Sequence, residues 1–217
     1  MKKLLSLLLV LALLASVGVT AAFADSDAYL GVMLSTNVMS LDTNLATDGE
    51  SFEVIADCID GLMQMDADGA AIPAIAESYD LSDDGTVYTF HLRDANWANG
   101  DPVTAYDFEF AWKRIAEEAG EYAYLFDTSV GCIKNADAII YEGADPDTLG
   151  VEAVDEKTFV VTLEVPVSFF PSLMYFPTFY PINEAFYNSL DEGTYGTSPE
   201  TFLSNGAFVL ESYPPGT

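Results

Sequence analysis

The clearest pattern in the chain is an alternation of apolar and polar residues that predicts short strands joined by turns. Over residues 86–92, Tyr88, Phe90 and Leu92 fall on one face of a strand and the intervening residues fall on the other. Asp84-Gly85 stands directly before this strand and is a hairpin signal. The same criteria predict hairpin turns at residues 68–69 and 155–157, a turn at 99–100, and strands at 29–34, 151–154, 158–165 and 207–210.

Other segments repeat their apolar residues at helical spacing. Thr47 and Glu50 have the spacing of a capping box, and Gly61 stands where the following helix is expected to end. Thr104 and Asp107 predict the start of a second helix. The buried stripes of these two helices are expected to be Phe52, Ile55, Ile59 and Leu62, and Phe108, Trp112 and Ile115. Short helices or turns are expected at 122–126 and 135–141, and a helix plus a proline-bound extended piece at 168–187.

Hairpins interspersed with helices predict a mixed α+β or α/β fold. The chain has 217 residues, of which 50% are hydrophobic and 13% aromatic, so a folded core is expected. Neither an internal repeat nor a low-complexity linker divides the chain. One large domain or two small ones fit the length.

The N-terminus has the pattern of an export signal. Met1-Lys2-Lys3 is basic, residues 4–19 are almost entirely apolar or small, and Ala22-Phe23-Ala24 has the small-x-small pattern of a cleavage site. The sequence therefore predicts a signal peptide over residues 1–24, cleaved after Ala24; the alternative is a membrane anchor. Since no cysteine lies near the cleavage point, a lipid anchor is not expected. We expect residues 25–217 in the periplasm or outside the cell, and the envelope type stays open.

Charge changes the picture of possible partners. The chain carries 7 Lys and Arg against 35 Asp and Glu, a net charge of −28. This balance argues against nucleic acid and against anionic lipid, because both need a basic patch. A soluble, self-repelling surface is the simplest interpretation, and attraction of cationic ligands or adaptation to salt are the alternatives.

The residues needed for common catalytic chemistry are missing. His91, the single histidine, falls in an alternating strand, where a structural role is expected, and no nucleophile-elbow motif accompanies it. Cys58 and Cys132 could be buried thiols or a disulfide, but a metal site built from them is not expected. Asp66-Ala67-Asp68 begins like a calcium loop, but Ala71 occupies the position that needs glycine. We expect a binding protein with no cofactor and no catalytic residues, although a secreted hydrolase or an acidic interaction domain stays open.

A series of short motifs runs in order from residue 40 to residue 214. It comprises Ser40-Leu41-Asp42, Asp60-Gly61-Leu62, Asp68-Gly69, Pro73, Ala76-Glu77-Ser78-Tyr79, residues 84–93, Trp97, residues 99–105, Asp107-Phe108, Trp112-Lys113-Arg114, Leu149-Gly150-Val151, Ala153-Val154-Asp155 and Ser204-Asn205-Gly206-Ala207-Phe208. In order and spacing this series resembles the bacterial extracellular solute-binding proteins of family 5, the oligopeptide and dipeptide receptors of ABC importers. Within it we assign Arg93, which needs an acidic partner or solvent, and Trp97 to the scaffold.

The resemblance implies a type II periplasmic-binding-protein-like fold, in which two lobes hold a peptide between them and the loaded receptor docks on a membrane permease. Thr47, Asp48 and Gly49 match the loop whose backbone contacts a bound peptide, and Tyr122 matches an aromatic residue at the cleft edge. From the residues alone, Thr47 caps a helix and Tyr122 packs in the core. We expect a monomer that binds short peptides and contacts permease subunits.

The resemblance also carries an expectation about extent and ligand. Family members are considerably longer, so residues 25–217 are expected to be an incomplete first lobe, with the second lobe following Thr217. Relatives within the fold take up nickel, haem or oligosaccharides, and these ligands remain alternatives to peptides. The single histidine argues mildly against a metal.

Overall fold

The structure is a computed structural model that describes residues 29–213. It divides after Leu34 into two units, which are described separately. The strand expected at residues 29–34 is wrong: these residues form neither helix nor strand, and the side chains of Tyr29 and Met33 are exposed. The expected signal peptide and its cleavage after Ala24 lie outside the described residues.

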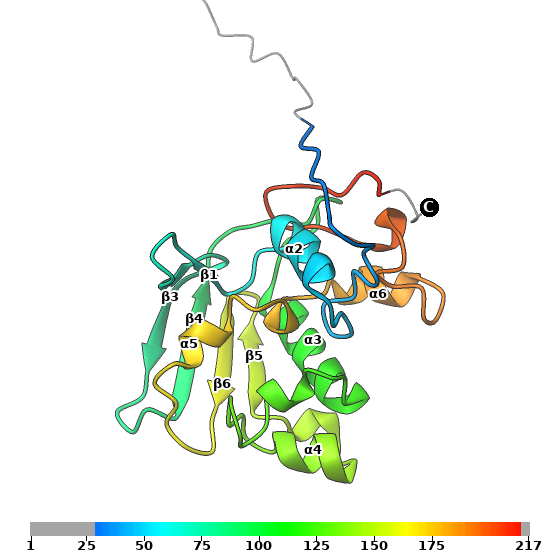
Figure 1. Ribbon diagram of the computed structural model, residues 1–217. Helices are drawn as coiled ribbons and strands as arrows, with labels where there is room; N and C mark the ends of the chain where they lie inside the picture. Colours follow the sequence, from blue (N-terminus) through cyan, green and yellow to red (C-terminus); the bar gives the residue numbers. More distant parts are fainter. Residues whose placement is uncertain (1–28, 214–217) are drawn as a thin grey trace, which may run out of the picture. The chain divides into compact units, whose positions relative to one another are not determined.

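The second unit is built around an antiparallel sheet of four strands in the order β3-β4-β6-β5 (Figure 1). A separate two-stranded sheet, β1-β2, precedes it in the sequence. The strands are β1 (Met63–Met65), β2 (Ala71–Pro73), β3 (Ala76–Leu81), β4 (Val87–Leu92), β5 (Val151–Asp155) and β6 (Thr158–Thr162). The helices are α2 (Gly49–Cys58), α3 (Ala105–Glu118), α4 (Ala136–Glu142), α5 (Phe170–Leu173) and α6 (Glu184–Ser189), with short 3-10 turns η1 (Ala123–Leu125), η2 (Pro146–Thr148), η3 (Pro177–Phe179) and η4 (Pro199–Thr201). Among residues 29–213, no helix is long and apolar enough to cross a lipid bilayer.

The three predicted hairpins are confirmed. Gly69 and Gly85 turn the chain with φ of +83° and +72°, values that glycine adopts without strain. The β5–β6 hairpin forms around residues 156–157, although β6 ends at Thr162 rather than at residue 165. The buried face of β4 is also confirmed, since Tyr88, Phe90 and Leu92 are buried while the alternate residues are half-exposed.

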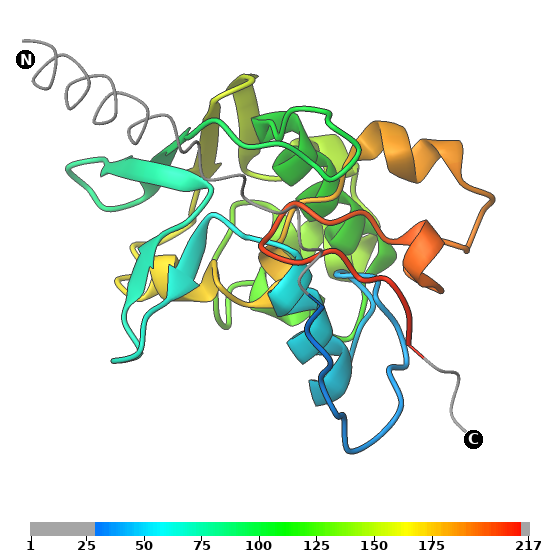
Figure 2. The same cartoon turned by 90° about the horizontal axis from the view of Figure 1, so that it is seen from above.

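Helix α3 covers the buried face of the sheet. It lies against β5 and β6, and α4 and α6 lie against it in turn (Figures 1 and 2). Its predicted start is confirmed, because Asp107 Oδ2 accepts a hydrogen bond of 2.8 Å from the backbone N–H of Thr104. At the centre of the core, the Trp112 ring packs edge-on against Phe126, Phe159 and Phe179. The aromatic residues of α3 and β6 therefore hold the helix on the sheet.

Two further predictions are wrong. Residues 207–210 form no strand, because they have no pairing partner among the described residues and Phe208 and Val209 are exposed. Helix α2 ends at Cys58, and Gly61 is not its cap. Gly61 is needed for close packing instead, since a Cβ there would lie 2.6 Å from the Met174 carbonyl oxygen.

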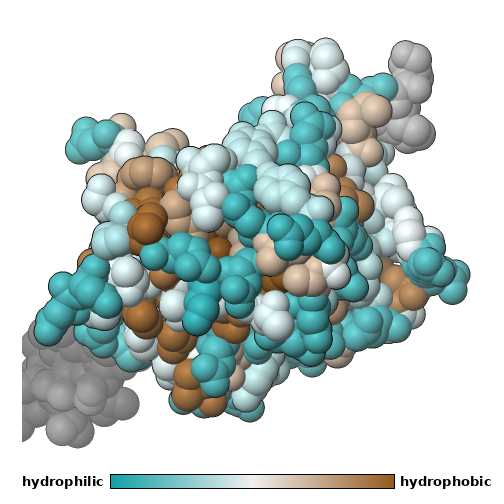
Figure 3. Space-filling model, turned by 90° about the horizontal axis from the view of Figure 1, so that it is seen from below, coloured by the Kyte–Doolittle hydropathy of each residue, from teal (hydrophilic) through white to brown (hydrophobic). Residues whose placement is uncertain are grey.

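The surface is mixed in character. Figure 3, which views the molecule from below, shows small apolar areas separated by hydrophilic residues. With 35 acidic and 7 basic residues in the sequence, the charges on the surface are mostly negative.

Candidate functional site

The predicted loop 47–49 forms the start of α2. Asp48, not Thr47, is the N-cap: its Oδ1 accepts a 2.9 Å hydrogen bond from the Ser51 N–H, and its Oδ2 accepts one of 2.7 Å from the Ser51 hydroxyl. The predicted capping box from Thr47 to Glu50 is therefore wrong. Asp48, one residue later, accepts from a backbone N–H of the first helical turn that has no partner within the helix. Thr47 and Gly49 are therefore exposed, and neither caps the helix.

The segment before α2 ties this helix start in place. The Ser51 hydroxyl accepts hydrogen bonds from the backbone N–H groups of Met39 at 3.1 Å and Ser40 at 3.2 Å. The Ser35 hydroxyl donates to Glu50, and this bond lowers the pKa of the Glu50 carboxyl below its ordinary value. The helix start is thus anchored to the segment that precedes it.

The first N–H group of α2, that of Gly49, has no hydrogen-bond partner among the described residues. The first N–H groups of a helix have no partner within the helix and carry the positive end of its dipole. The Gly49 N–H can therefore donate to a carbonyl or carboxylate oxygen of a ligand.

Four partly exposed aromatic side chains, the aromatic cluster, lie beside this helix start: Phe52, Tyr122, Tyr124 and Phe176. The Tyr122 ring centroid is 5.4 Å from those of Phe52 and Phe176 and 6.0 Å from that of Tyr124. Phe52 follows Gly49 by three residues on α2, so one helix carries both the free amide and part of the cluster. Phe52, three residues after Gly49, thus contacts Tyr122, and Tyr122 is half-buried rather than a core residue.

A second region, which sequence reasoning did not single out, contains a buried ion pair. Arg114 on α3 donates to both carboxylate oxygens of Asp42, at 2.8 and 2.7 Å, and its Nε donates to Glu118 at 3.0 Å. The side chains of Arg114 and Asp42 are 9% and 5% exposed. Burial alone would lower the pKa of Arg114, but the hydrogen bonds and charges of Asp42 and Glu118 raise it above its ordinary value.

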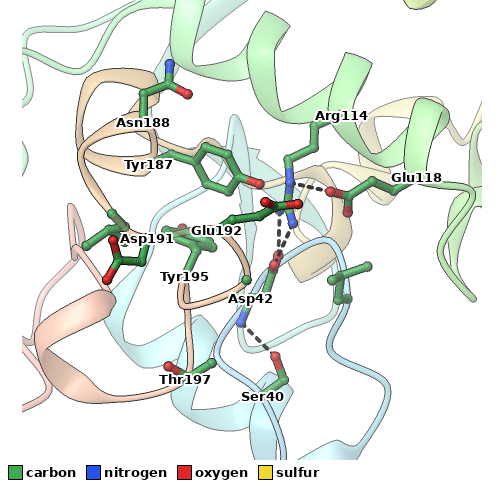
Figure 4. Close-up of a pocket in the computed structure, with 13 residues that line it drawn as sticks. Ser40, Asp42, Arg114, Glu118, Tyr187, Asn188, Asp191, Glu192, Tyr195 and Thr197 are labelled. Atoms are coloured by element: carbon green, nitrogen blue, oxygen red, sulfur yellow. Dashed lines mark hydrogen bonds and ion pairs between the residues drawn. The ribbon is translucent and has the colours of Figure 1, made fainter.

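This ion pair lines a hollow of about 550 Å³, which Figure 4 shows in close-up. The hollow contains none of the four predicted site residues. Both members of the ion pair lie in motifs that the sequence displays, Ser40-Leu41-Asp42 and Trp112-Lys113-Arg114. The available sequence signal for this pair was that Arg114 is one of few basic residues in an acidic chain. Its partner, Asp42, lies 72 residues away along the sequence.

The two residues assigned to the scaffold have structural roles. Arg93 meets its expected acidic partner, Asp60, with Nη2 and Oδ2 3.4 Å apart. The Trp97 ring is buried and its N–H donates to Asp107 at 3.2 Å. Burial raises the pKa of the Asp60 and Asp107 carboxyls. Arg93 therefore links the end of β4 to the segment after α2, and Trp97 links its own turn to the first turn of α3.

The other residues considered in the sequence, His91, the two cysteines and Asp66, have separate surroundings in the structure. His91 pairs across the β3–β4 ladder with Asp80, with Nε2 and Oδ2 2.9 Å apart. Cys58 and Cys132 are free, and burial raises the pKa of each thiol. Over residues 29–213, no group of three or more His, Cys, Asp or Glu side chains has the arrangement of a metal site. Asp66 instead holds the Gly69 turn, accepting hydrogen bonds from the N–H groups of Asp68 and Ala70.

Comparison with known proteins points to one family. The family model described as bacterial extracellular solute-binding proteins, family 5 Middle, matches residues 70–217. The chain is 38% identical over 182 residues to the dipeptide-binding protein of Lactococcus lactis, and 37% identical over 180 residues to the periplasmic oligopeptide-binding protein OppA of Escherichia coli. Each alignment covers 82% of this chain and 32% of the relative, so the chain spans about a third of the length of the curated relatives it matches.

Comparison with solved structures leads to the same family. The structure of Listeria monocytogenes OppA bound to peptide matches with a TM-score of 0.76 and 40% identity, covering 80% of this chain and 34% of the other. The mixed α+β arrangement is therefore that of part of a substrate-binding protein. The relatives are binding proteins rather than enzymes, and those from Escherichia coli are named as periplasmic. The chain belongs to the bacterial extracellular solute-binding proteins of family 5.

Proposed function

We propose that the chain is the N-terminal part of an extracytoplasmic receptor that binds short peptides for an ABC importer. The observation that carries the proposal is the unused Gly49 amide beside the aromatic cluster, at the positions where the family resemblance expects peptide contact. The relatives' names, which refer to dipeptides and oligopeptides, support the same ligand class.

In this proposal the site residues have different roles. Thr47, Asp48 and Gly49 offer backbone groups, because the Asp48 side chain is already used as the helix cap. A peptide carbonyl or carboxylate oxygen accepts from the Gly49 N–H, where the helix dipole favours negative charge. Tyr122 and its neighbours cover the apolar parts of the peptide side chains. Backbone recognition leaves the peptide sequence free to vary.

The wider role follows from the same proposal. Residues 1–24 direct export and are removed after Ala24, and the mature protein works in the periplasm or outside the cell. It acts as a monomer that docks on permease subunits, and it carries no cofactor and catalyses no reaction. The second lobe needed to enclose the peptide belongs to the remaining two thirds of a chain of the relatives' length.

The first test uses the native protein purified from its host. A mixed pool of two- to six-residue peptides is expected to raise its melting temperature, because a ligand that binds only the folded state stabilises it. Native mass spectrometry then identifies which peptides are retained. A protein stabilised by none of the pool would contradict the proposal.

A pair of substitutions at Gly49 tests the contact itself. Gly49→Pro removes only the N–H, because proline is well tolerated at the first position of a helix and Asp48, with φ −115° and ψ 155°, has the extended backbone that precedes proline. Gly49→Ala keeps the N–H, and its Cβ would meet nothing within 4 Å. We expect peptide affinity to fall about five- to tenfold in Gly49→Pro and to be unchanged in Gly49→Ala. Equal affinities in the two variants would show that the amide does not bind the peptide.

A further inference from the structure

Positive charge is absent from the segments that form most of the proposed peptide site. Residues 29–92 and residues 158–213 contain neither lysine nor arginine. The start of α2, Phe52 and Phe176 all lie in these two segments. Besides the two lysines next to Met1, the whole sequence has five basic residues, which are Arg93, Lys113, Arg114, Lys134 and Lys157.

Four of these five cations are already paired within the protein. Arg93 pairs with Asp60, Lys113 with Glu109 and Asp147, Arg114 with Asp42 and Glu118, and Lys157 with Asp94. The fifth, Lys134, is exposed and has no ion pair within residues 29–213. It stands two residues before α4, which lies at the opposite end of the second unit from α2 (Figure 1). Among the described residues, the start of α2 therefore has no unpaired basic side chain near it.

Two exposed carboxylates flank the aromatic cluster along the chain. Glu53 follows Phe52 on α2 and stands four residues after Gly49, so it lies on the same side of the helix as the free N–H. Glu121 directly precedes Tyr122. Both side chains are exposed, and neither carboxylate forms an ion pair or a hydrogen bond with any described residue. The charge next to the site is therefore negative, as it is over the whole chain.

The aromatic cluster offers a cation a second kind of partner. Its neighbouring rings have centroids 5.0 to 6.0 Å apart, and Tyr124 is 42% exposed. The face of an aromatic ring attracts a cation, and the alkyl stem of lysine or arginine packs against the same surface. The protein uses this contact elsewhere, since the guanidinium carbon of Arg114 lies 4.7 Å from the Tyr187 ring centroid. The cluster is thus better suited to a cationic side chain than to an acidic one.

Long-range electrostatics acts in the same direction. The chain has a net charge of −28, so its field attracts cationic ligands and repels anionic ones before contact. We propose that the site selects peptides that carry a lysine or arginine side chain, which lies against the aromatic cluster, and that it discriminates against acidic peptides. This inference rests on the proposed peptide-binding function. The Gly49 N–H meets the peptide backbone, and the aromatic rings with their neighbouring carboxylates set the preference for charge.

Calorimetric titration of the native protein with matched peptides tests the preference. Three sets of alanine tetrapeptides carry one lysine, norleucine or glutamate at each position in turn, and norleucine keeps the alkyl chain of lysine without its charge. We expect the tightest lysine peptide to bind about tenfold more tightly than its norleucine counterpart, and the glutamate counterpart to bind more weakly still. The advantage of lysine over norleucine should shrink as the salt concentration rises.

The outcomes separate this inference from the peptide proposal. Lysine and norleucine peptides of equal affinity, or a glutamate peptide that binds as tightly as the lysine peptide, would overturn the charge preference while peptide binding stands. The peptides retained from the mixed pool should likewise be enriched in lysine and arginine, and a retained set with the average charge of the pool would overturn the preference as well. A protein that binds neither the tetrapeptides nor the pool would overturn both proposals.

A charge-matched pair of variants tests whether the cation lies beside the aromatic cluster. Glu53→Gln with Glu121→Gln removes two exposed carboxylates next to the site, and Glu77→Gln with Glu142→Gln removes two exposed carboxylates on β3 and α4. We expect the ratio of lysine to norleucine affinity to fall about threefold in the first pair and less than about 1.5-fold in the second, because exposed charges act mainly over short distances. Equal changes in the two pairs would overturn the placement of the cation at this site.

Tyr122→Leu and Tyr124→Leu test the aromatic rings, since each keeps an apolar side chain but removes an aromatic face. We expect the ratio of lysine to norleucine affinity to fall about threefold in each variant. Tyr124 is the more exposed ring, so its replacement should change the melting temperature less. An unchanged ratio in both variants would contradict the stacking of a cationic side chain on the aromatic cluster.

Discussion

The start of α2 and the buried pair of Arg114 with Asp42 use the same kinds of group in opposite ways. At α2 the carboxylate of Asp48 is satisfied, but the Gly49 N–H has no partner among the described residues and the neighbouring aromatic rings are partly exposed. At Arg114 two carboxylates satisfy the guanidinium almost completely, and the pair is nearly removed from solvent.

This difference separates the groups that are free to bind a ligand from those that are already used within the protein. A buried charge must be paired within the protein, so Arg114 and Asp42 fix the position of α3 against the segment before α2. An exposed helix start can leave a donor unused, because water satisfies it until a ligand replaces the water. Asp191 and Glu192, which line the hollow beside the pair, are exposed and form no ion pair with any residue of the described chain.

The largest expected effect is the loss of the buried pair. Arg114→Met leaves the Asp42 carboxylate buried without its cation, and we expect the free energy of unfolding to fall by about 3–5 kcal/mol. Lys134→Met is the control, because Lys134 is exposed and forms no ion pair with any residue of the described chain. The control should change stability by less than about 1 kcal/mol. Urea unfolding measures both, and equal losses would contradict the comparison.

Glycine substitutions in the two regions are expected to change the stability of the protein by intermediate amounts and in opposite directions. Gly196 has φ +68°, and a Cβ there would lie 2.3 Å from the backbone nitrogen of Asp42. We therefore expect Gly196→Ala to destabilise the protein by about 2 kcal/mol. Gly49→Ala, in open helical surroundings, should stabilise it by about 0.5 kcal/mol. Thermal unfolding measures both signs, and a neutral Gly196→Ala would show that this loop can move away from Asp42.

The smallest effect expected is an opposite dependence on pH. The pKa of Glu50 is lowered from 4.5, chiefly by the hydrogen bond from Ser35, so its contribution to stability is present above pH 4.5 and is lost as the pH falls through its folded-state pKa. The pKa of Glu118 is raised from 4.5 by burial, so its contribution is present below pH 4.5 and is lost as the pH rises through its folded-state pKa.

Melting temperatures of Glu50→Gln and Glu118→Gln, each compared with the unaltered protein from about pH 3.5 to about pH 7, test these signs. The advantage of the unaltered protein over Glu50→Gln should grow as the pH rises. Its advantage over Glu118→Gln should shrink over the same range. Parallel curves for the two variants would contradict the assignment of burial at one site and hydrogen bonding at the other.

Elements whose cause is local were predictable from the sequence. The turns at Gly69 and Gly85 need a positive φ, and the Thr104–Asp107 cap forms within one turn of helix. The strands expected at 29–34 and 207–210 failed, because an apolar run becomes a strand only when another strand pairs with it. The N-cap of α2 was misplaced by one residue, since Thr47 and Asp48 are both good caps.

The hairpins, the start of α3, the acidity and the family resemblance could be predicted from the sequence, because these depend on neighbouring residues or on the order of motifs. The packing of Tyr122 against Phe52 of α2 and the pairing of Arg114 with Asp42, 72 residues away, emerge only in the folded chain. Burial and pairing depend on which distant segments pack together, and a linear pattern carries no direct record of those contacts.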